Sequence, residues 1–226
     1  MIYLSVLLVG CSCEKEIELE ILTKEINCLD IEASEFTEYL KLDGLAPNGA
    51  RTVIQYKITN NGNKTYYFNI DNYKNNLKYS HIMIDRAFLS IEYNGESQSP
   101  KLRQPSSEMS ADDFYLKYLN YNDYLSYKRG VGKSKNFILH PKETLYFEWF
   151  VILPYGNVLE TTNYTIDLNS SKEYSASVFI HSDTINYKKI LSRTDLKTIE
   201  DNGYEIYNGT IKSKNRIPIV FNNSSN

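Results

Sequence analysis

Apolar and polar residues alternate along most of the chain with a period of two, which is typical of half-buried β-strands. Asn and Gly cluster between several of these segments, and both residues favour tight turns. The pattern therefore predicts an all-β fold, built as an antiparallel β-sandwich. The alternating segments are 17–21, 53–60, 65–70, 86–93, 173–181 and 217–221.

Two turns predict which strands pair as neighbours. Segments 53–60 and 65–70 flank the sequence NNGN and are expected to form a hairpin. Within 203–212, Asn208-Gly209 stands between two short apolar runs and indicates a second hairpin.

Two further segments carry predictions about position in a sheet. Segment 144–153 (TLYFEWFVIL) is apolar on both faces apart from Glu148, as expected of a central strand. Trp149 lies within it and is interpreted as a core residue. Pro218 indicates an edge position for the last strand, 217–221, because proline cannot donate a ladder hydrogen bond.

Helical signals are few. A short helix is expected near 190–201, where apolar residues recur at helical spacing. Ser192 or Thr194 would cap its N-terminus, and Asn202-Gly203 would end it.

The strand-turn-strand pattern of segment 52–58, the NNGN turn and segment 65–70 resembles the early hairpin of immunoglobulin-like bacterial surface domains. The resemblance implies an immunoglobulin-like β-sandwich. Such a sandwich takes about 100 residues, and this chain has 226. We expect the surplus in a second domain or in an insertion at about 98–134.

Tyrosine is abundant, with 20 residues in the chain, and five tyrosines recur at every third position of the insertion. On an α-helix, steps of three advance by about 300°, so successive tyrosines slip back by about 60°. One buried helix face cannot hold all five. The insertion is interpreted either as a helix packed over one end of the sandwich or as a lobe that binds a partner through Tyr115, Tyr118, Tyr121, Tyr124 and Tyr127.

Residues 8–11 (LVGC) follow a short apolar run, and they resemble the lipobox of bacterial lipoproteins. The resemblance implies that residues 1–10 are a signal peptide and that Cys11 carries acyl chains that anchor the protein. Residues 12–16 (SCEKE) resemble the surface-export signal of Bacteroidota lipoproteins. We therefore expect attachment to the outer membrane, facing either the cell surface or the periplasm. Residues 11–33 would form a tether or first strand, and residues 34–226 the β-sandwich body.

The remaining cysteines, Cys13 and Cys28, form a possible disulfide, since an exported protein meets an oxidising compartment. No pair of cysteines has zinc-site spacing. The three histidines, His81, His140 and His181, are scattered along the chain.

The chain carries 25 Lys and Arg against 28 Asp and Glu, and this net charge of −3 argues against a nucleic-acid surface. It lacks HExxH, GxSxG, GxGxxG and P-loop motifs. We therefore expect no catalytic residues, metal or cofactor.

Together these features predict an anchored, non-enzymatic binding module for a protein or glycan partner. The alternative is a structural, accessory or immunity-type subunit of a cell-envelope machine. A hydrolase without a recognisable motif is a third hypothesis.

Overall fold

The computed structural model describes residues 16–30, 51–70, 81–103, 135–154 and 163–222. These residues form strands joined by loops, with two short helices, so the predicted all-β fold is confirmed. Among them, no helix has both the length and the apolar character needed to cross a membrane. Residues 8–11, Cys13 and the five tyrosines of the insertion lie outside the described ranges.

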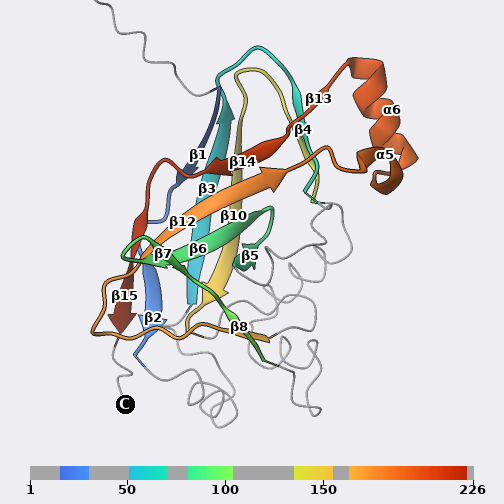
Figure 1. Cartoon of the computed structure of the whole chain (residues 1–226). Helices are drawn as coiled ribbons and strands as arrows, with labels where there is room; N and C mark the ends of the chain where they lie inside the picture. The colour runs from blue at the N-terminus through green and yellow to red at the C-terminus, as the bar shows by residue number, and fades with distance from the viewer. Residues whose placement is uncertain (1–15, 31–50, 71–80, 104–134, 155–162, 223–226) are drawn as a thin grey trace, which may run out of the picture.

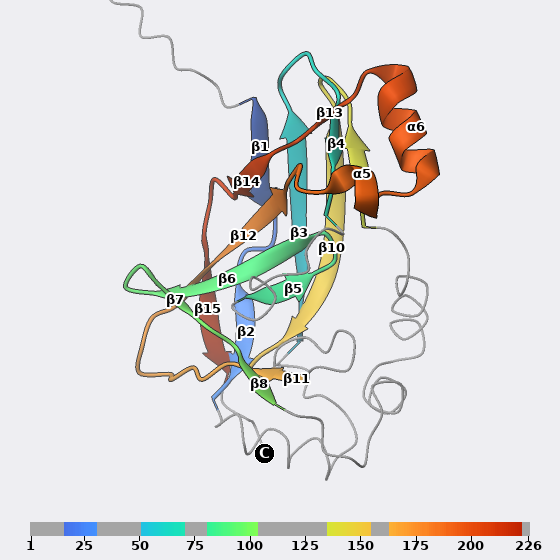
Figure 2. The same ribbon diagram turned by 45° about the vertical axis from the view of Figure 1, so that its right-hand side comes forward.

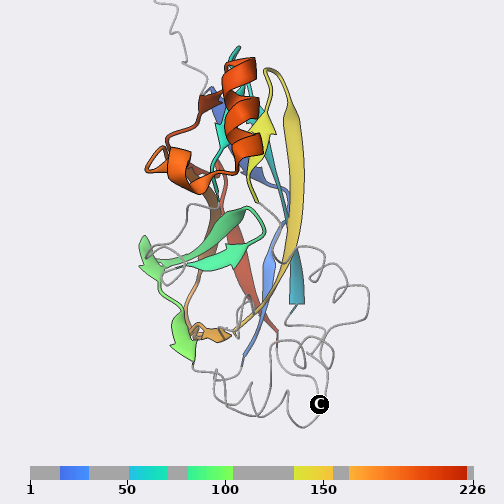
Figure 3. The same cartoon turned by 90° about the vertical axis from the view of Figure 1, so that its right-hand side faces the viewer.

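Two main sheets face each other (Figures 1 and 3). The smaller has the order β1 (Ile17–Ile21), β3 (Arg51–Asn60), β10 (Thr144–Ile152). The larger has the order β2 (Ile26–Leu29), β15 (Ile217–Asn222), β12 (Ser175–Ser182), β6 (Ala87–Tyr93), β5 (Ile82–Ile84). Beside β12 lies β14 (Gly209–Lys212), and beside β6 lies β7 (Glu96–Gln98).

Two smaller sheets complete the described structure. One has the order β13 (Glu205–Ile206), β4 (Tyr66–Phe68), β9 (Phe137–Leu139), and the other pairs β8 (Lys101–Arg103) with β11 (Asn163–Thr165). The segment 11–33, expected as a tether or first strand, thus contains β1 and β2. Of the expected insertion 98–134, the structure describes only its start, which includes β8. An immunoglobulin-like strand order stays a prediction.

The alternation that predicted the strands also explains the core. In β1, residues 17, 19 and 21 are buried and residues 18 and 20 are partly exposed. Strand β3 follows the same rule, with Ile54, Tyr56 and Ile58 completely buried. These side chains meet those of β6 and β12 in one hydrophobic core between the two sheets, because each sheet has one apolar face to bury.

The predicted helix near 190–201 is confirmed, and it is preceded by a single turn. Helix α5 spans Tyr187–Ile190 and α6 spans Arg193–Asn202. The side chain of Ser192 caps α6 by accepting a hydrogen bond from the backbone N–H of Asp195. Gly203, with φ 65°, ends the helix. Figure 2 shows the helices beside the sheet of β4, where Ile199 packs against Tyr67.

The predicted hairpin between 53–60 and 65–70 is wrong. Strand β3 pairs with β1 and β10, whereas β4 pairs with β13 and β9 in another sheet. A two-residue hairpin turn needs positive φ angles, and none of residues 60–64 has one. The buried side chain of Asn60 instead donates to the carbonyls of Lys64 and Leu139 and accepts from the N–H of Gly62. These bonds hold residues 60–64 in a corner that is wider than a hairpin turn and that carries the chain from the sheet of β3 to the sheet of β4.

The predicted hairpin around Asn208-Gly209 is also wrong. Strand β13 runs parallel to β4, and β14 runs antiparallel to β12, so the two strands join different sheets. Asn94-Gly95 does form a tight turn, with φ angles of 51° and 84°, between β6 and β7.

Two predicted strand positions are corrected. Strand β10 lies at the edge of its sheet instead of its centre, and Tyr146 on it is 68% exposed. Trp149 is only partly buried, although it packs against the core as predicted. Strand β15 lies between β12 and β2 instead of at an edge. Pro218 is tolerated there because pairing with β2 begins only at the next residue, Ile219.

Candidate binding groove between two strand edges

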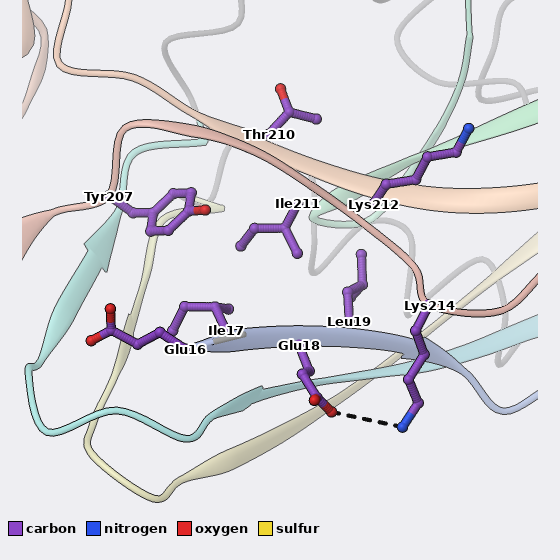
Figure 4. Close-up of a pocket in the computed structure, with 9 residues that line it drawn as sticks. All are labelled: Glu16, Ile17, Glu18, Leu19, Tyr207, Thr210, Ile211, Lys212 and Lys214. Carbon is purple, nitrogen blue, oxygen red and sulfur yellow. Dashed lines mark ion pairs between the residues drawn. The ribbon is translucent and has the colours of Figure 1, made fainter. Parts of the chain in front are cut away.

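A groove of about 510 Å³ separates β1 from β14 (Figure 4). This volume is within the range of ligand-binding pockets in proteins. Its apolar lining comes from the buried residues Ile17, Leu19 and Ile211. Its polar lining consists of Glu16 and Glu18 from the β1 side, and Thr210, Lys212 and Lys214 from the β14 side, with Tyr207 at one end.

The β1 wall of the groove is a strand edge. Among the strands that the structure describes, β1 pairs only with β3. The carbonyl of Glu16 accepts from Asn61, and the N–H of Leu22 donates to Gln55, so even-numbered residues direct their backbone groups at β3. Because backbone groups alternate along a strand, the N–H and C=O groups of residues 17, 19 and 21 point away from β3, toward β14.

The β14 wall is a second strand edge. Strand β14 pairs with β12, and the N–H of Ser213, just beyond its end, donates to Val178 of β12. Odd-numbered residues therefore face β12. The backbone groups of Thr210 and Lys212 point the other way, toward β1.

The two edges meet at one end of the groove. There the N–H of Lys214 donates to the carbonyl of Leu19 at 2.8 Å. The side chain of Asn215 accepts from the N–H of Ile21 at 2.9 Å and donates to its carbonyl at 2.8 Å.

Away from this junction, the edges are open. Over the described residues, no hydrogen-bond partner is present for the N–H and C=O of Ile17 or the N–H of Leu19. The same holds, within the described ranges, for the backbone groups of Thr210 and Lys212. Unpaired strand edges are the positions at which further strands add to a sheet.

The lysines of the groove are paired with carboxylates. Lys214 lies 2.9 Å from Glu20 and 3.7 Å from Glu18. The hydrogen bond from Lys214, with a further one from Lys57, lowers the pKa of the Glu20 carboxyl. Glu20 in turn raises the pKa of Lys214. These groups are therefore charged at neutral pH.

Lys212 takes part in a more buried ion pair. Its ammonium lies 2.6 Å from Glu92, and Arg216 lies 3.0 Å from the other oxygen of the same carboxylate. Burial opposes ionisation of Glu92, but the hydrogen bond from Lys212 and the two positive charges outweigh it, so the pKa of Glu92 is lowered. This arrangement anchors β14 to β6.

Tyr207 forms an ordered end to the groove. Its ring stacks on Phe68 at 5.0 Å and meets Tyr66 edge-on at 5.6 Å. Burial and nearby Glu16 raise the pKa of Tyr207, and the pKa of Tyr66 rises to about 12 for the same reasons. Both hydroxyls are therefore neutral at physiological pH.

Of the site residues predicted from the sequence, the structure describes one. Cys28 lies in the core, and burial raises the pKa of its thiol to about 12. Its candidate disulfide partner, Cys13, lies outside the described residues, as do Cys11 and the tyrosines at 115, 118, 121, 124 and 127. The disulfide, the lipid site and the tyrosine contacts stay predictions.

The histidines lie at separate positions. His81 precedes β5 and meets Phe179 edge-on, His140 follows β9, and His181 is in β12 and hydrogen-bonds Thr210. Within the described ranges, no three His, Cys, Asp or Glu residues gather as metal ligands would.

Sequence reasoning missed the groove. The alternation of β1 predicts which side chains are buried, but an unpaired edge depends on which strands fail to meet, and that is not encoded locally. Comparison of the chain with protein-family models, with curated proteins and with solved structures found no match.

Proposed function

We propose that this protein is an outer-membrane-anchored lipoprotein that acts as a non-enzymatic binding module for a protein partner. One observation carries the choice of site: the groove between β1 and β14 has an apolar lining and two strand edges with unpaired backbone groups. Apolar surface supplies affinity, and fixed polar groups supply orientation. The ammonium groups at the groove already have carboxylate partners, which favours binding over acid–base chemistry.

A protein partner fits the groove better than a glycan. Exposed aromatic rings suit sugar faces, but Tyr207 is the single aromatic residue among those that line the groove. That ring, Tyr207, is already packed against Phe68 and Tyr66. The unpaired N–H and C=O groups along both walls recur at every second residue, as do those along one edge of an extended peptide.

The position of the groove favours the second candidate function, an accessory or immunity-type subunit of an envelope machine. Glu16 lines the groove and is five residues from the predicted lipid site, Cys11. Five extended residues span at most about 18 Å. A lipid on Cys11 would hold the groove close to the membrane, within reach of a partner embedded in or attached to that membrane.

Lipidation is tested by replacing Cys11 with Ser, with Cys13→Ser as the matched control. We expect Cys11→Ser to abolish incorporation of labelled fatty acid and to release the protein from the membrane fraction. Cys13→Ser should leave both unchanged. Acylation that persists in Cys11→Ser would contradict the proposed anchor.

Partner binding is tested by photo-crosslinking in intact cells that make the protein. A photoreactive residue at Glu18, on the groove, is compared with one at Tyr146, which is exposed on β10 in the same sheet. We expect one defined envelope protein to be crosslinked from position 18 and not from position 146. Identical products from both positions would refute the groove as the binding site.

A further inference from the structure

We propose that the partner binds by inserting a single extended β-strand between β1 and β14, so that the two main sheets become continuous at this edge. The inference rests on the proposed function and names the partner's binding element. It follows from the backbone geometry of the two walls, from the side chain of Asn215 and from the pairing of the charges around the groove.

The backbone groups of the two walls have the spacing of a strand acceptor. On β1, the unpaired groups belong to Ile17 and Leu19, and on β14 to Thr210 and Lys212. In both cases they recur at every second residue, which is the repeat with which a neighbouring strand presents its own N–H and C=O groups. A strand has two such edges, so a single inserted segment can bond to both walls. Residues of β1 and β14 now lie with Cα atoms within 8 Å of each other, so the walls must move apart to about 9.5 Å, twice the spacing of neighbouring strands, to admit it.

Asn215 shows that the edge of β1 accepts this type of partner. Its carboxamide accepts from the N–H of Ile21 and donates to the carbonyl of the same residue. A residue of a paired strand makes the same two bonds. The amide of Asn215 therefore stands in for one residue of an added strand at the end where the walls meet.

The same contacts limit the length of the inserted strand. The N–H of Lys214 bonds the carbonyl of Leu19, and the side chain of Asn215 bonds the N–H and the carbonyl of Ile21. These outward groups of β1 therefore already have partners. The insert must end before that junction, so it spans the open part of β1 and the four residues of β14.

The surroundings also define the side chains of the insert. Residues on its inner face would contact Ile17, Leu19 and Ile211, which are buried and apolar. Residues on its outer face would lie near Lys212, which is paired with Glu92, and Lys214, which is paired with Glu20. We therefore infer a strand with apolar residues at alternate positions and uncharged polar residues between them.

The protein's own processed N-terminus does not meet these requirements. Between the predicted lipid site, Cys11, and Glu16 stand four residues, Ser-Cys-Glu-Lys. That stretch is too short to reverse direction and run back along β1, and it lacks the alternating apolar residues.

The probe for the experiment is a synthetic capped pentapeptide, Ile-Thr-Val-Thr-Ile, added to the full mature chain. Amide hydrogen exchange is followed by nuclear magnetic resonance at the outward N–H groups of Ile17, Leu19, Thr210 and Lys212. We expect the peptide to slow exchange of these amides at least tenfold. The amide of Ile211, which already faces β12, should not change.

Two controls test whether backbone pairing is responsible. A peptide with N-methylated Ile and Val residues keeps the side chains but loses the donors on one edge, and should give no protection. The variant Thr210→Pro removes one outward N–H of β14, and it should bind the unmodified peptide at least tenfold more weakly than Thr210→Ala. Both variants lose the hydrogen bond between Thr210 and His181, so the difference between them reports the backbone N–H of residue 210. Their melting temperatures show whether each variant is folded.

Strand insertion is overturned if the peptide gives no protection at millimolar concentration, or if the N-methylated peptide protects equally. Should position 18 still crosslink one envelope protein in that case, the proposed function stands and only the mode of binding is wrong. Protection by the peptide without any envelope partner would support the strand site and contradict the proposed function.

Discussion

Replacing Asn215 with Ala tests the junction that closes one end of the groove. The substitution removes the two side-chain hydrogen bonds to Ile21. Each such bond contributes about 0.5–1.5 kcal/mol net, so we expect the free energy of unfolding to fall by about 1–3 kcal/mol. With a urea m-value of about 2 kcal/mol/M, a loss in the middle of this range lowers the unfolding midpoint by about 1 M.

Urea unfolding measures the loss, and amide exchange locates it. The Ile21 N–H should exchange faster in Asn215→Ala, whereas Glu20, which faces β3, should keep its protection. Asn202→Ala is the matched control, because Asn202 makes a single exposed hydrogen bond to Thr198, and it should cost less than about 0.5 kcal/mol.

A second variant separates the two bonds of Asn215. Asn215→Asp keeps an acceptor for the Ile21 N–H but places a carboxylate oxygen against the Ile21 carbonyl. It should be the less stable variant at pH 7 and should recover stability in acid, where protonation restores a donor. Equal stability of Asn215→Ala and Asn202→Ala, with unchanged exchange at Ile21, would refute the strand-like role of Asn215.

Three further predictions concern the frame around the groove. Asn60→Ala should cost about 2–4 kcal/mol in urea unfolding, because it leaves three backbone groups of the corner, one buried and two partly buried, without their partner, whereas exposed Asn63→Ala should cost under about 0.5 kcal/mol. Glu92→Gln should cost about 1–2 kcal/mol at pH 7. Because the pKa of Glu92 is lowered in the folded state, its contribution is complete above the unfolded pKa and disappears as pH falls through the folded pKa. The difference from the natural protein should therefore vanish in acid, and a difference that is constant with pH would exclude this ion pair as its source. Ser192→Ala should cost about 1 kcal/mol through loss of the α6 cap, measured by thermal unfolding, and an unchanged melting temperature would contradict the assigned cap.

The sequence predicted strands well because burial in a sheet leaves a local mark. The alternation of 17–21 matches β1 residue for residue. The segment 86–93 likewise contains β6, although this strand is buried on both faces from Ala87 to Glu92. The helix near 190–201 was predictable for the same reason, since Ser192 and Gly203 mark its ends locally.

Strand partners were harder to predict. Asn208-Gly209 and the NNGN sequence have turn composition, yet each connects strands of different sheets. The composition of a turn favours certain backbone angles, but the corner at Asn60 also depends on a hydrogen bond to Leu139, which is 79 residues away. The apolar character of β10 likewise reflects packing at a sheet edge, where Arg51 lies over Phe150 at 5.1 Å.

The groove could not be predicted from local pattern at all. Its two walls are far apart in the chain, since Ile21 and Asn215, which bond at the junction, are separated by 194 residues. Both strands alternate like the paired strands of the core. What distinguishes β1 and β14 from the other edge strands is that their open edges line one groove. Only the three-dimensional arrangement shows that Ile17 and Thr210 face the same space.

The most direct test of the groove as the binding site is amide exchange of the protein in complex with the partner crosslinked from position 18. We expect binding to slow exchange at Ile17, Leu19, Thr210 and Lys212 and to leave exchange in β3 and helix α6 unchanged. Protection confined to β3 or α6, with rapid exchange retained along β1 and β14, would contradict it.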